Sequence, residues 1–258
     1  MATLGVQVLS LRGMKHLAEC LESVKWADAV TVLHAGEGEP LIGMNPFSSL
    51  TLRKFVSTQE WDGLAREVRT DWVLHLWGEE RLEGELQEDL RALCRKELPQ
   101  VPMAYRVPVR SHLLGRWVEG SLLGPSPALR LSRRVDEIPF GWWNVTDSKV
   151  RESPTLPRGW ISDRTATALK DGVDLIQGVS ELWAERLRTK GQEPGPISMV
   201  LGPFQVFLRM LFNNGIFSHG FAGLTLSTLT AYATFLTGAK VWEVRNVRER
   251  EKVGDKVP

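Results

Sequence analysis

Two glutamates stand directly after an almost wholly apolar run. The run extends from Trp72 to Trp77 and is followed by Gly78, Glu79 and Glu80. Its length and composition are typical of a strand buried on both faces of a parallel sheet. Open α/β sheets bind ligands at the carboxyl ends of their strands, so the two carboxylates lie where a metal ion and a phosphate are expected. Acidic residues also favour helix starts, and this stretch alone favours the simpler interpretation that they cap the following helix.

Six arginines between residues 105 and 134 form a second candidate group, with Glu119 as the one acidic residue in that range. Arginine matches phosphate and carboxylate geometry through two parallel hydrogen bonds, so the group could bind a diphosphate or an acidic glycan. A solvated strand face explains the same charges equally well. The arginines are Arg106, Arg110, Arg116, Arg130, Arg133 and Arg134.

The overall composition restricts the function less than these groups do. A net charge of +1 disfavours a nucleic-acid binder. Cys20 and Cys94 fall on apolar positions of predicted helices without metal-ligand spacing, which indicates core residues in a reducing compartment. The first residues show no pattern typical of a secretory signal, so we expect a cytoplasmic protein.

The first hundred residues alternate between strand and helix patterns. A strand, a helix and a strand within the first 34 residues form a βαβ unit with parallel pairing. The same alternation continues to the helix that follows Trp77, which predicts an open α/β sheet. The expected strands cover residues 5–11, 29–34, 50–56 and 72–77, the expected helices cover residues 14–24, 61–68 and 82–93, and a turn-rich loop covers residues 35–46.

The middle of the chain has a different pattern. Residues 105–110 and 129–132 alternate apolar and polar side chains, which predicts two strands with one polar face. Trp142, Trp143 and Trp160 lie among prolines and glycines, where they either stack on sugar rings or, as is more common, pack in the protein. A helix is expected over residues 166–187, followed by a linker over residues 191–196.

The last segment is apolar, and residues 215–238 contain no Asp, Glu, Lys or Arg. Such a segment forms either helices buried against the body or another subunit, or a helix in a membrane surface. Its serines, threonines and glycines make a true membrane span the weaker interpretation. The tail from Arg245 has five basic and three acidic residues, consistent with contact with an anionic leaflet.

Several stretches together resemble bacterial family 2 glycosyltransferases, in particular the lipopolysaccharide core-type glucosyltransferase branch. The resemblance implies a GT-A fold, with a Rossmann-like, mostly parallel sheet flanked by helices and a C-terminal apolar helical region. It implies a nucleotide-sugar-binding half over residues 1–135, an acceptor-side segment over 136–195, apolar helices over 196–245 and a charged tail over 246–258. The matching stretches are residues 20–28, 71–74, 105–117, 129–134, 207–209, 215–217 and 232–243.

The resemblance also implies a nucleotide site, although the chain departs from the family there. Arg12 stands in place of an Asn-Glu pair, His34 in place of an aspartate, and Trp77 in place of the first aspartate of the metal motif. Arg12 could supply positive charge near the phosphates, and His34 could bind the base or ribose. A surface salt bridge for Arg12 and a surface loop position for His34 are at least as plausible.

The resemblance also implies which residues would contact the metal ion and the diphosphate and which would act as the general base. Glu79 could supply one carboxylate to Mg²⁺ or Mn²⁺, which Trp77 cannot ligate. Glu80 keeps its family identity and, with Arg130 and Arg133, would contact the diphosphate or acceptor. In the family mechanism the cation neutralises the departing diphosphate while a carboxylate deprotonates the acceptor hydroxyl. The resemblance places this general base at Asp147, or less well at Glu152.

Two functional hypotheses follow from these residues. In the first, an inverting transferase moves a sugar from a nucleotide donor to an envelope glycan or lipid-linked acceptor at the inner face of the cytoplasmic membrane. In the second, a catalytically inactive relative keeps the fold as a binding or scaffolding partner, without a cofactor. Either protein could form a homo-oligomer through the C-terminal helices.

Overall fold

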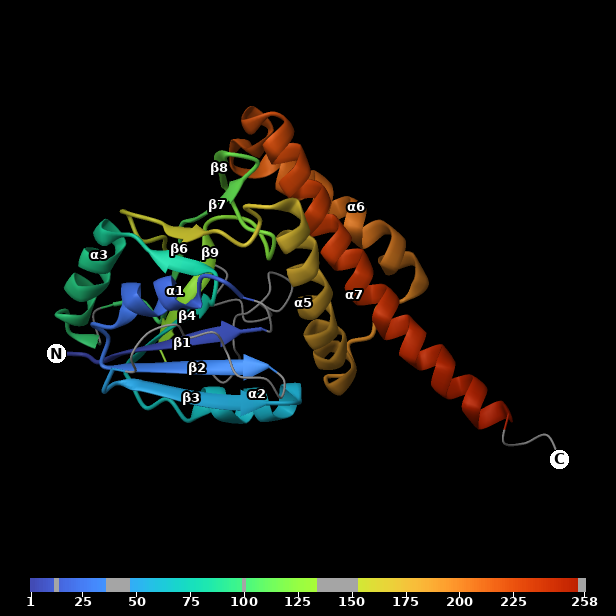
Figure 1. Cartoon of the computed structure of the whole chain (residues 1–258), viewed down its shortest axis with the longest axis horizontal. Coiled ribbons are helices and arrows are strands. Elements are labelled where there is room, and N and C mark those ends of the chain that lie inside the picture. The colour runs from blue at the N-terminus through green and yellow to red at the C-terminus, as the bar shows by residue number, and fades with distance from the viewer. Residues whose placement is uncertain (12–13, 36–46, 99–100, 134–152, 255–258) are drawn as a thin grey trace.

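The computed structural model describes residues 1–11, 14–35, 47–98, 101–133 and 153–254. Their main element is a six-stranded mixed sheet with the strand order β3-β2-β1-β4-β9-β6 (Figure 1). The first four strands in this order are parallel, β9 runs antiparallel to β4, and β6 runs antiparallel to β9. The mostly parallel α/β sheet predicted from the sequence is therefore confirmed. The strands are β1 (Leu4–Ser10), β2 (Ala29–Ala35), β3 (Leu50–Phe55), β4 (Trp72–Trp77), β6 (Ala104–Val107) and β9 (Ala128–Arg133).

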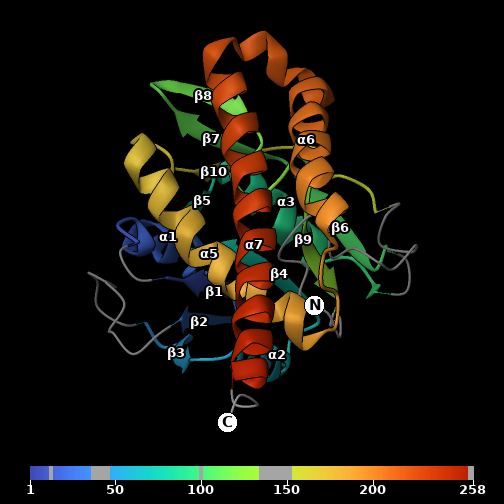
Figure 2. The same cartoon turned by 90° about the vertical axis from the view of Figure 1, so that its right-hand side faces the viewer.

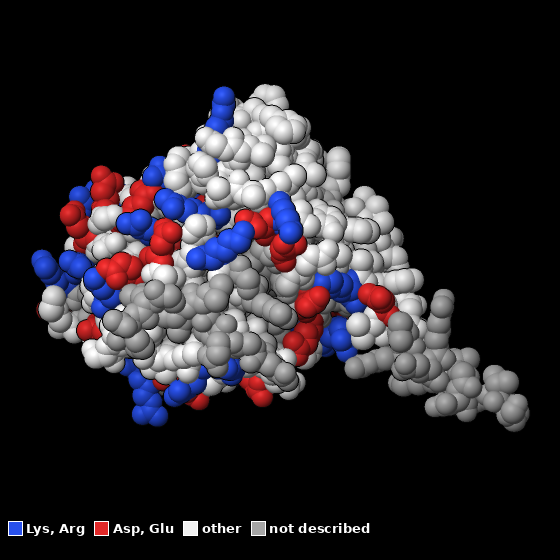
Figure 3. Space-filling model, viewed as in Figure 1, with Lys and Arg blue, Asp and Glu red and all other residues white. Residues whose placement is uncertain are grey.

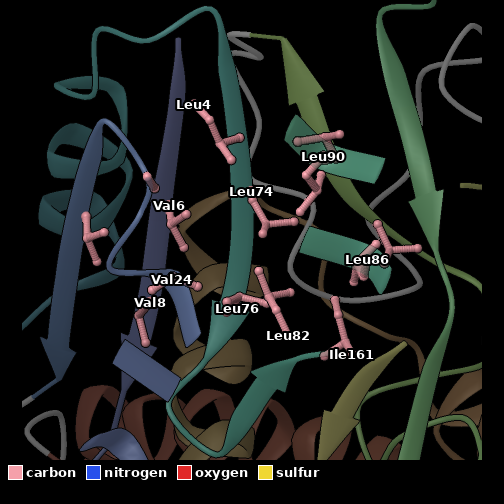
Figure 4. Close-up of a cluster of buried hydrophobic side chains, with 14 of the residues drawn as sticks. Leu4, Val6, Val8, Val24, Leu74, Leu76, Leu82, Leu86, Leu90 and Ile161 are labelled. Atoms are coloured by element: carbon pink, nitrogen blue, oxygen red, sulfur yellow. The ribbon is translucent and has the colours of Figure 1, made fainter. Parts of the chain in front are cut away.

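Helices cover both faces of this sheet. One face packs against α1 (Leu17–Val24) and α3 (Gly84–Cys94), whose leucines meet alternate side chains of β1 and β4 (Figure 4). Cys20 and Cys94 lie in this core as free thiols, as expected. The opposite face receives α2 (Thr58–Arg66), where the Gln7 amide donates to the Ala65 carbonyl at 2.6 Å. The period-two alternation of the strands thus supplies both core layers.

A second sheet corrects two sequence-based expectations. Its strand order is β5-β10-β7-β8, and its members are β5 (Glu80–Leu82), β7 (Val109–Leu113), β8 (Arg116–Glu119) and β10 (Ile161–Asp163). Leu82 therefore ends a strand instead of starting a helix. The single strand expected over residues 105–110 is two strands in two sheets, because Pro108 has no N–H with which to continue a ladder.

Three long helices follow. Helix α5 (Leu169–Thr189) stands across the carboxyl ends of β1, β2 and β3, and α6 (Pro196–Phe212) and α7 (Phe221–Gly254) lie side by side on its outer side (Figures 1 and 2). A short 3₁₀ helix, η2 (Asn213–His219), joins α6 to α7. One side of this helix pair is buried against the body, as one of the sequence-based alternatives predicted. In the part of the chain that is described, no helix has the length and apolarity of a membrane span.

Candidate functional site

A cavity of about 620 Å³ lies at the carboxyl ends of the four parallel strands. The strand ends line one side of it, and α5 lines the other over about four turns. Parallel strands all end at the same edge of a sheet, which is why this edge forms the usual ligand crevice of doubly wound folds. The lining includes Leu11, Ala35, Phe55 and Glu79 from the strand side, Lys15 and His16 before α1, Arg164 after β10, and Lys170, Asp171, Gly178 and Glu181 on α5.

Glu79 lines the cavity but uses both carboxylate oxygens within the protein. Its Oε1 accepts from the Lys15 backbone N–H at 2.5 Å, and its Oε2 accepts from the His16 N–H at 3.2 Å. These groups begin α1, and the side chain of the N-cap residue His16 forms no cap. Glu79 thus caps a helix, but α1 instead of the following helix that the sequence suggested. Burial raises the pKa of Glu79, and the two N–H donors oppose that rise.

Glu80 is fully buried and forms an ion pair with Arg130. The Arg130 Nη2 donates to Oε1 at 2.6 Å, and the Trp77 backbone N–H donates to Oε2 at 2.8 Å. Burial raises the pKa of Glu80 to about 7, although the Arg130 charge opposes the rise. The sequence analysis assigned both residues to contacts with the diphosphate or the acceptor. Their contact is with each other, and neither lines the cavity.

Asp163, at the end of β10, is a buried carboxylate that sequence reasoning missed. Its Oδ2 accepts from the Ser111 hydroxyl at 2.8 Å, while Oδ1 accepts from the backbone N–H and hydroxyl of Thr165. The available signal was an Asp two residues before a Thr, the spacing of a typical Asx turn. Asp163 therefore holds the turn that brings Arg164 to the cavity wall.

These carboxylates do not fit a divalent cation. Glu79, Glu80 and Asp163 are each hydrogen-bonded through both oxygens, as the distances above show. Within the described ranges, no group of three or more His, Cys, Asp and Glu side chains could hold a metal ion. Mg²⁺ and Mn²⁺ require several free oxygen ligands. The metal site implied by the family resemblance is therefore not formed by these residues.

His34 and Trp77 lie beneath the carboxyl edge. His34 is 2% exposed, and its Nδ1 is 3.1 Å from the Ser10 hydroxyl of the neighbouring strand, so the surface position considered for it is wrong. Trp77 is also 2% exposed and belongs to the core cluster that includes Leu9 and Trp61. Neither side chain lines the cavity. His34 directly precedes Ala35 in the sequence, and Trp77 lies two residues before Glu79; Ala35 and Glu79 do line it.

The arginines of residues 105–134 do not form one basic patch. Arg133 pairs in register with Trp72, at the amino end of β4, and therefore lies at the edge opposite the cavity. Arg110 stacks 4.7 Å from the Trp117 ring centre and 5.8 Å from that of Trp160, which accounts for Trp160 as packing. The remaining predicted residues Arg12, Arg134, Trp142, Trp143, Asp147 and Glu152 lie outside the described residues.

The mouth of the cavity carries charges of both signs. The Lys15 ammonium binds the Asp171 carboxylate at 2.8 Å, which joins the segment before α1 to the first turn of α5. A hydrogen bond from Lys15 to Asp171 raises the pKa of that ammonium. His16, Arg164 and Lys170 bring further donors to the same wall. A ligand with phosphate groups would find several hydrogen-bond donors here.

Comparison with known proteins gives the site a chemical context. The chain is 23% identical over 265 residues to the lipopolysaccharide core biosynthesis glycosyltransferase LpsC of Rhizobium meliloti (strain 1021), and the match covers 96% of this chain and 95% of LpsC. The chain is thus similar over nearly its whole length to a lipopolysaccharide core glycosyltransferase. The resemblance to lipopolysaccharide core-type glycosyltransferases that the sequence indicated is thereby confirmed.

Two further comparisons complete this context. No protein-family model matches the chain. Among solved structures, S. aureus TarS matches with a TM-score of 0.41 and 11% sequence identity, over 93% of this chain and 54% of the TarS chain. This chain thus spans about half the length of that structure.

Proposed function

We propose that this protein binds a nucleotide-diphosphate sugar in the cavity at the carboxyl edge of the sheet and transfers the sugar to an envelope glycan of the lipopolysaccharide core type. The main support for this proposal is the cavity itself, which has the size of a small-molecule site and lies at the ligand-binding edge of an α/β sheet. The similarity to LpsC over nearly the whole chain supports the reaction class. A glycan or lipid-linked acceptor would place the protein at the inner face of the cytoplasmic membrane.

Donors from three segments would hold the diphosphate. Lys15 and His16 approach from the segment before α1, Arg164 from the turn after β10, and Lys170 from the first turn of α5. Cationic donors around a phosphate stabilise its charge as it departs. Because the described carboxylates do not fit a divalent cation, donor binding is proposed to proceed without Mg²⁺ or Mn²⁺. Arg12 and Asp147 remain proposed as a further phosphate contact and as the general base.

A glycine substitution inside the cavity tests the binding site. A Cβ at Gly178 would lie 3.4 Å from Leu11 Cδ1, so the Gly178→Phe ring would enter the space between α5 and the strand ends. We expect at least a tenfold loss of affinity for the best donor among UDP-glucose, UDP-galactose and GDP-mannose, measured by isothermal titration calorimetry. Gly63→Phe is the matched control, since nothing lies within 4 Å of a Cβ there.

The donor affinities measured in this experiment decide whether the cavity is the binding site. Equal donor affinity in Gly178→Phe and wild type would exclude the cavity as the site, and no binding of any nucleotide sugar would overturn the proposal. Titrations with Mn²⁺ and with EDTA should give the same affinity. Circular dichroism of both variants checks that the fold is intact.

The second candidate function is that of a catalytically inactive relative acting as a binding or scaffolding partner. The observation that favours it is Glu79, whose carboxylate is used to cap α1. This protein would bind the nucleotide sugar without releasing nucleotide. Measurement of nucleotide release in the presence of truncated lipopolysaccharide acceptors separates the two functions, because only the transferase releases nucleotide diphosphate.

A further inference from the structure

The outer side of α6 and α7 exposes a large apolar surface, which we call the apolar face. Ile197 is 75% exposed and Phe221 is 74% exposed, values that are unusual for such side chains in a soluble monomer. The two helices lie side by side in Figure 2, where this side faces the viewer. The apolar face consists of Ile197, Val200, Leu201, Phe204 and Phe212 on α6, and Phe221, Leu224, Tyr232, Phe235 and Trp242 on α7.

Helical spacing places these residues on one stripe of each helix. On α7 they recur at intervals of three, eight, three and seven residues from Phe221 to Trp242, so at 3.6 residues per turn all five lie within an arc of about 80° around the helix. The opposite side of α7 is buried through Leu226, Leu229 and Ala233. Each helix therefore has two apolar sides, one packed in the core and a second left at the surface.

From residue 194 to residue 242 the apolar face carries positive charges and no carboxylate, and Glu243 directly follows it on α7. Residues 194–242 contain no Asp or Glu, and their only Lys and Arg residues are Arg209 and Lys240. Lys240 forms an ion pair with Glu181 of α5, whereas Arg209 is exposed on α6. In Figure 3 the part of the surface formed by these helices is almost free of charge, while charged side chains gather over the sheet. The face therefore matches an apolar surface that carries negative charge.

We propose that the apolar face docks on a lipid bilayer with anionic headgroups, with α6 and α7 lying parallel to the membrane plane. The phenylalanines and leucines would enter the acyl boundary, and Tyr232 and Trp242 would lie at headgroup level, where aromatic side chains with a polar atom are favoured. Arg209 would contact acidic headgroups. A second copy of this chain is the weaker occupant, since residues 194–242 of its own apolar face contain no carboxylate that could pair with Arg209.

Vesicle binding by the full chain tests this assignment without any nucleotide. Wild-type protein should float with vesicles of phosphatidylcholine and phosphatidylglycerol, and more weakly with phosphatidylcholine alone or at high salt. The double variant Phe204→Glu and Phe221→Glu should lose at least tenfold in affinity, because two large apolar groups leave the bilayer. Met103→Glu is the control. Met103 is a similarly exposed apolar residue, with 61% of its surface exposed, but it lies directly before β6 and outside the apolar face.

Three outcomes would overturn the proposal. The first is wild-type protein that fails to float with either vesicle. The second is equal flotation of the double variant and the control. The third is a wild-type dimer, seen by light scattering, that the double variant abolishes without any vesicle binding by either protein, since this assigns the face to a second copy. Both substituted positions are exposed, so circular dichroism should show an unchanged fold.

Discussion

At the scale of single residues, the buried pair of Glu80 and Arg130 joins the two sheets. Glu80 begins β5 of the smaller sheet, and Arg130 lies in β9 of the larger one. Removing two charges from water is costly, so such a pair contributes to stability only while both members are present. Each member alone would be an uncompensated charge in the core.

A double-mutant cycle tests this dependence. Arg130→Met should lower the free energy of unfolding by about 3 to 5 kcal/mol, because Glu80 keeps a buried carboxylate without its cation. Glu80→Gln alone should also destabilise the protein, and the double variant should recover roughly 1 to 3 kcal/mol relative to the sum of the two. Urea unfolding of the four proteins gives these values. Strictly additive effects would show that the pair is not coupled.

Residue identity alone indicated where these groups lie, but not what they contact. The sequence placed Glu79 and Glu80 correctly after a buried strand, because apolar runs and their ends are local features. Adjacent residues on a strand end point in opposite directions, so Glu79 turned to α1 and Glu80 to Arg130. Which partner each carboxylate meets depends on contacts 50 or more residues away in the chain, and no local pattern carries that information.

At the scale of elements, the parallel strands and their helices were predictable because each has its own periodicity. The second sheet was not, since β5 and β10 have only three residues each and gain stability from long-range pairing alone. The outer apolar side of α6 and α7 was visible as composition, but only the packing of α7 on α5 shows which side remains exposed. Short elements and exposed faces are thus decided by tertiary contacts.

The turn between α6 and α7 depends on one close backbone approach. A Cβ at Gly223 would lie 2.1 Å from the Ile216 carbonyl oxygen, so Gly223→Ala must displace η2 from the start of α7. We expect a loss of about 1 to 3 kcal/mol in the free energy of unfolding, as for other overpacked sites. Gly202→Ala, in α6 with nothing within 4 Å, should instead be neutral or stabilise by up to about 1 kcal/mol. Thermal unfolding compares the two; equal melting temperatures would contradict this geometry.

At the scale of the whole molecule, burial decreases from the centre of the large sheet to its edge. Every side chain of β1 and β4 is buried, whereas β3 is mostly exposed or half-buried. We therefore expect backbone amides of β1 and β4 to exchange with solvent only on global unfolding, and those of β3 to exchange sooner. Hydrogen exchange with mass spectrometry resolves these strands as separate peptides. Exchange in β4 as fast as in β3 would exclude this order of protection.

Strand β3 is bonded to β2 on one side and has no strand of the described sheet on the other. Its unpaired side is a template on which a foreign peptide could add itself, the first step toward an insoluble aggregate. The strand carries Arg53 and Lys54 in its last three residues. These cations act as gatekeepers: their mutual repulsion between chains discourages stacking, so replacing both with Thr should make the protein more prone to precipitate on concentration.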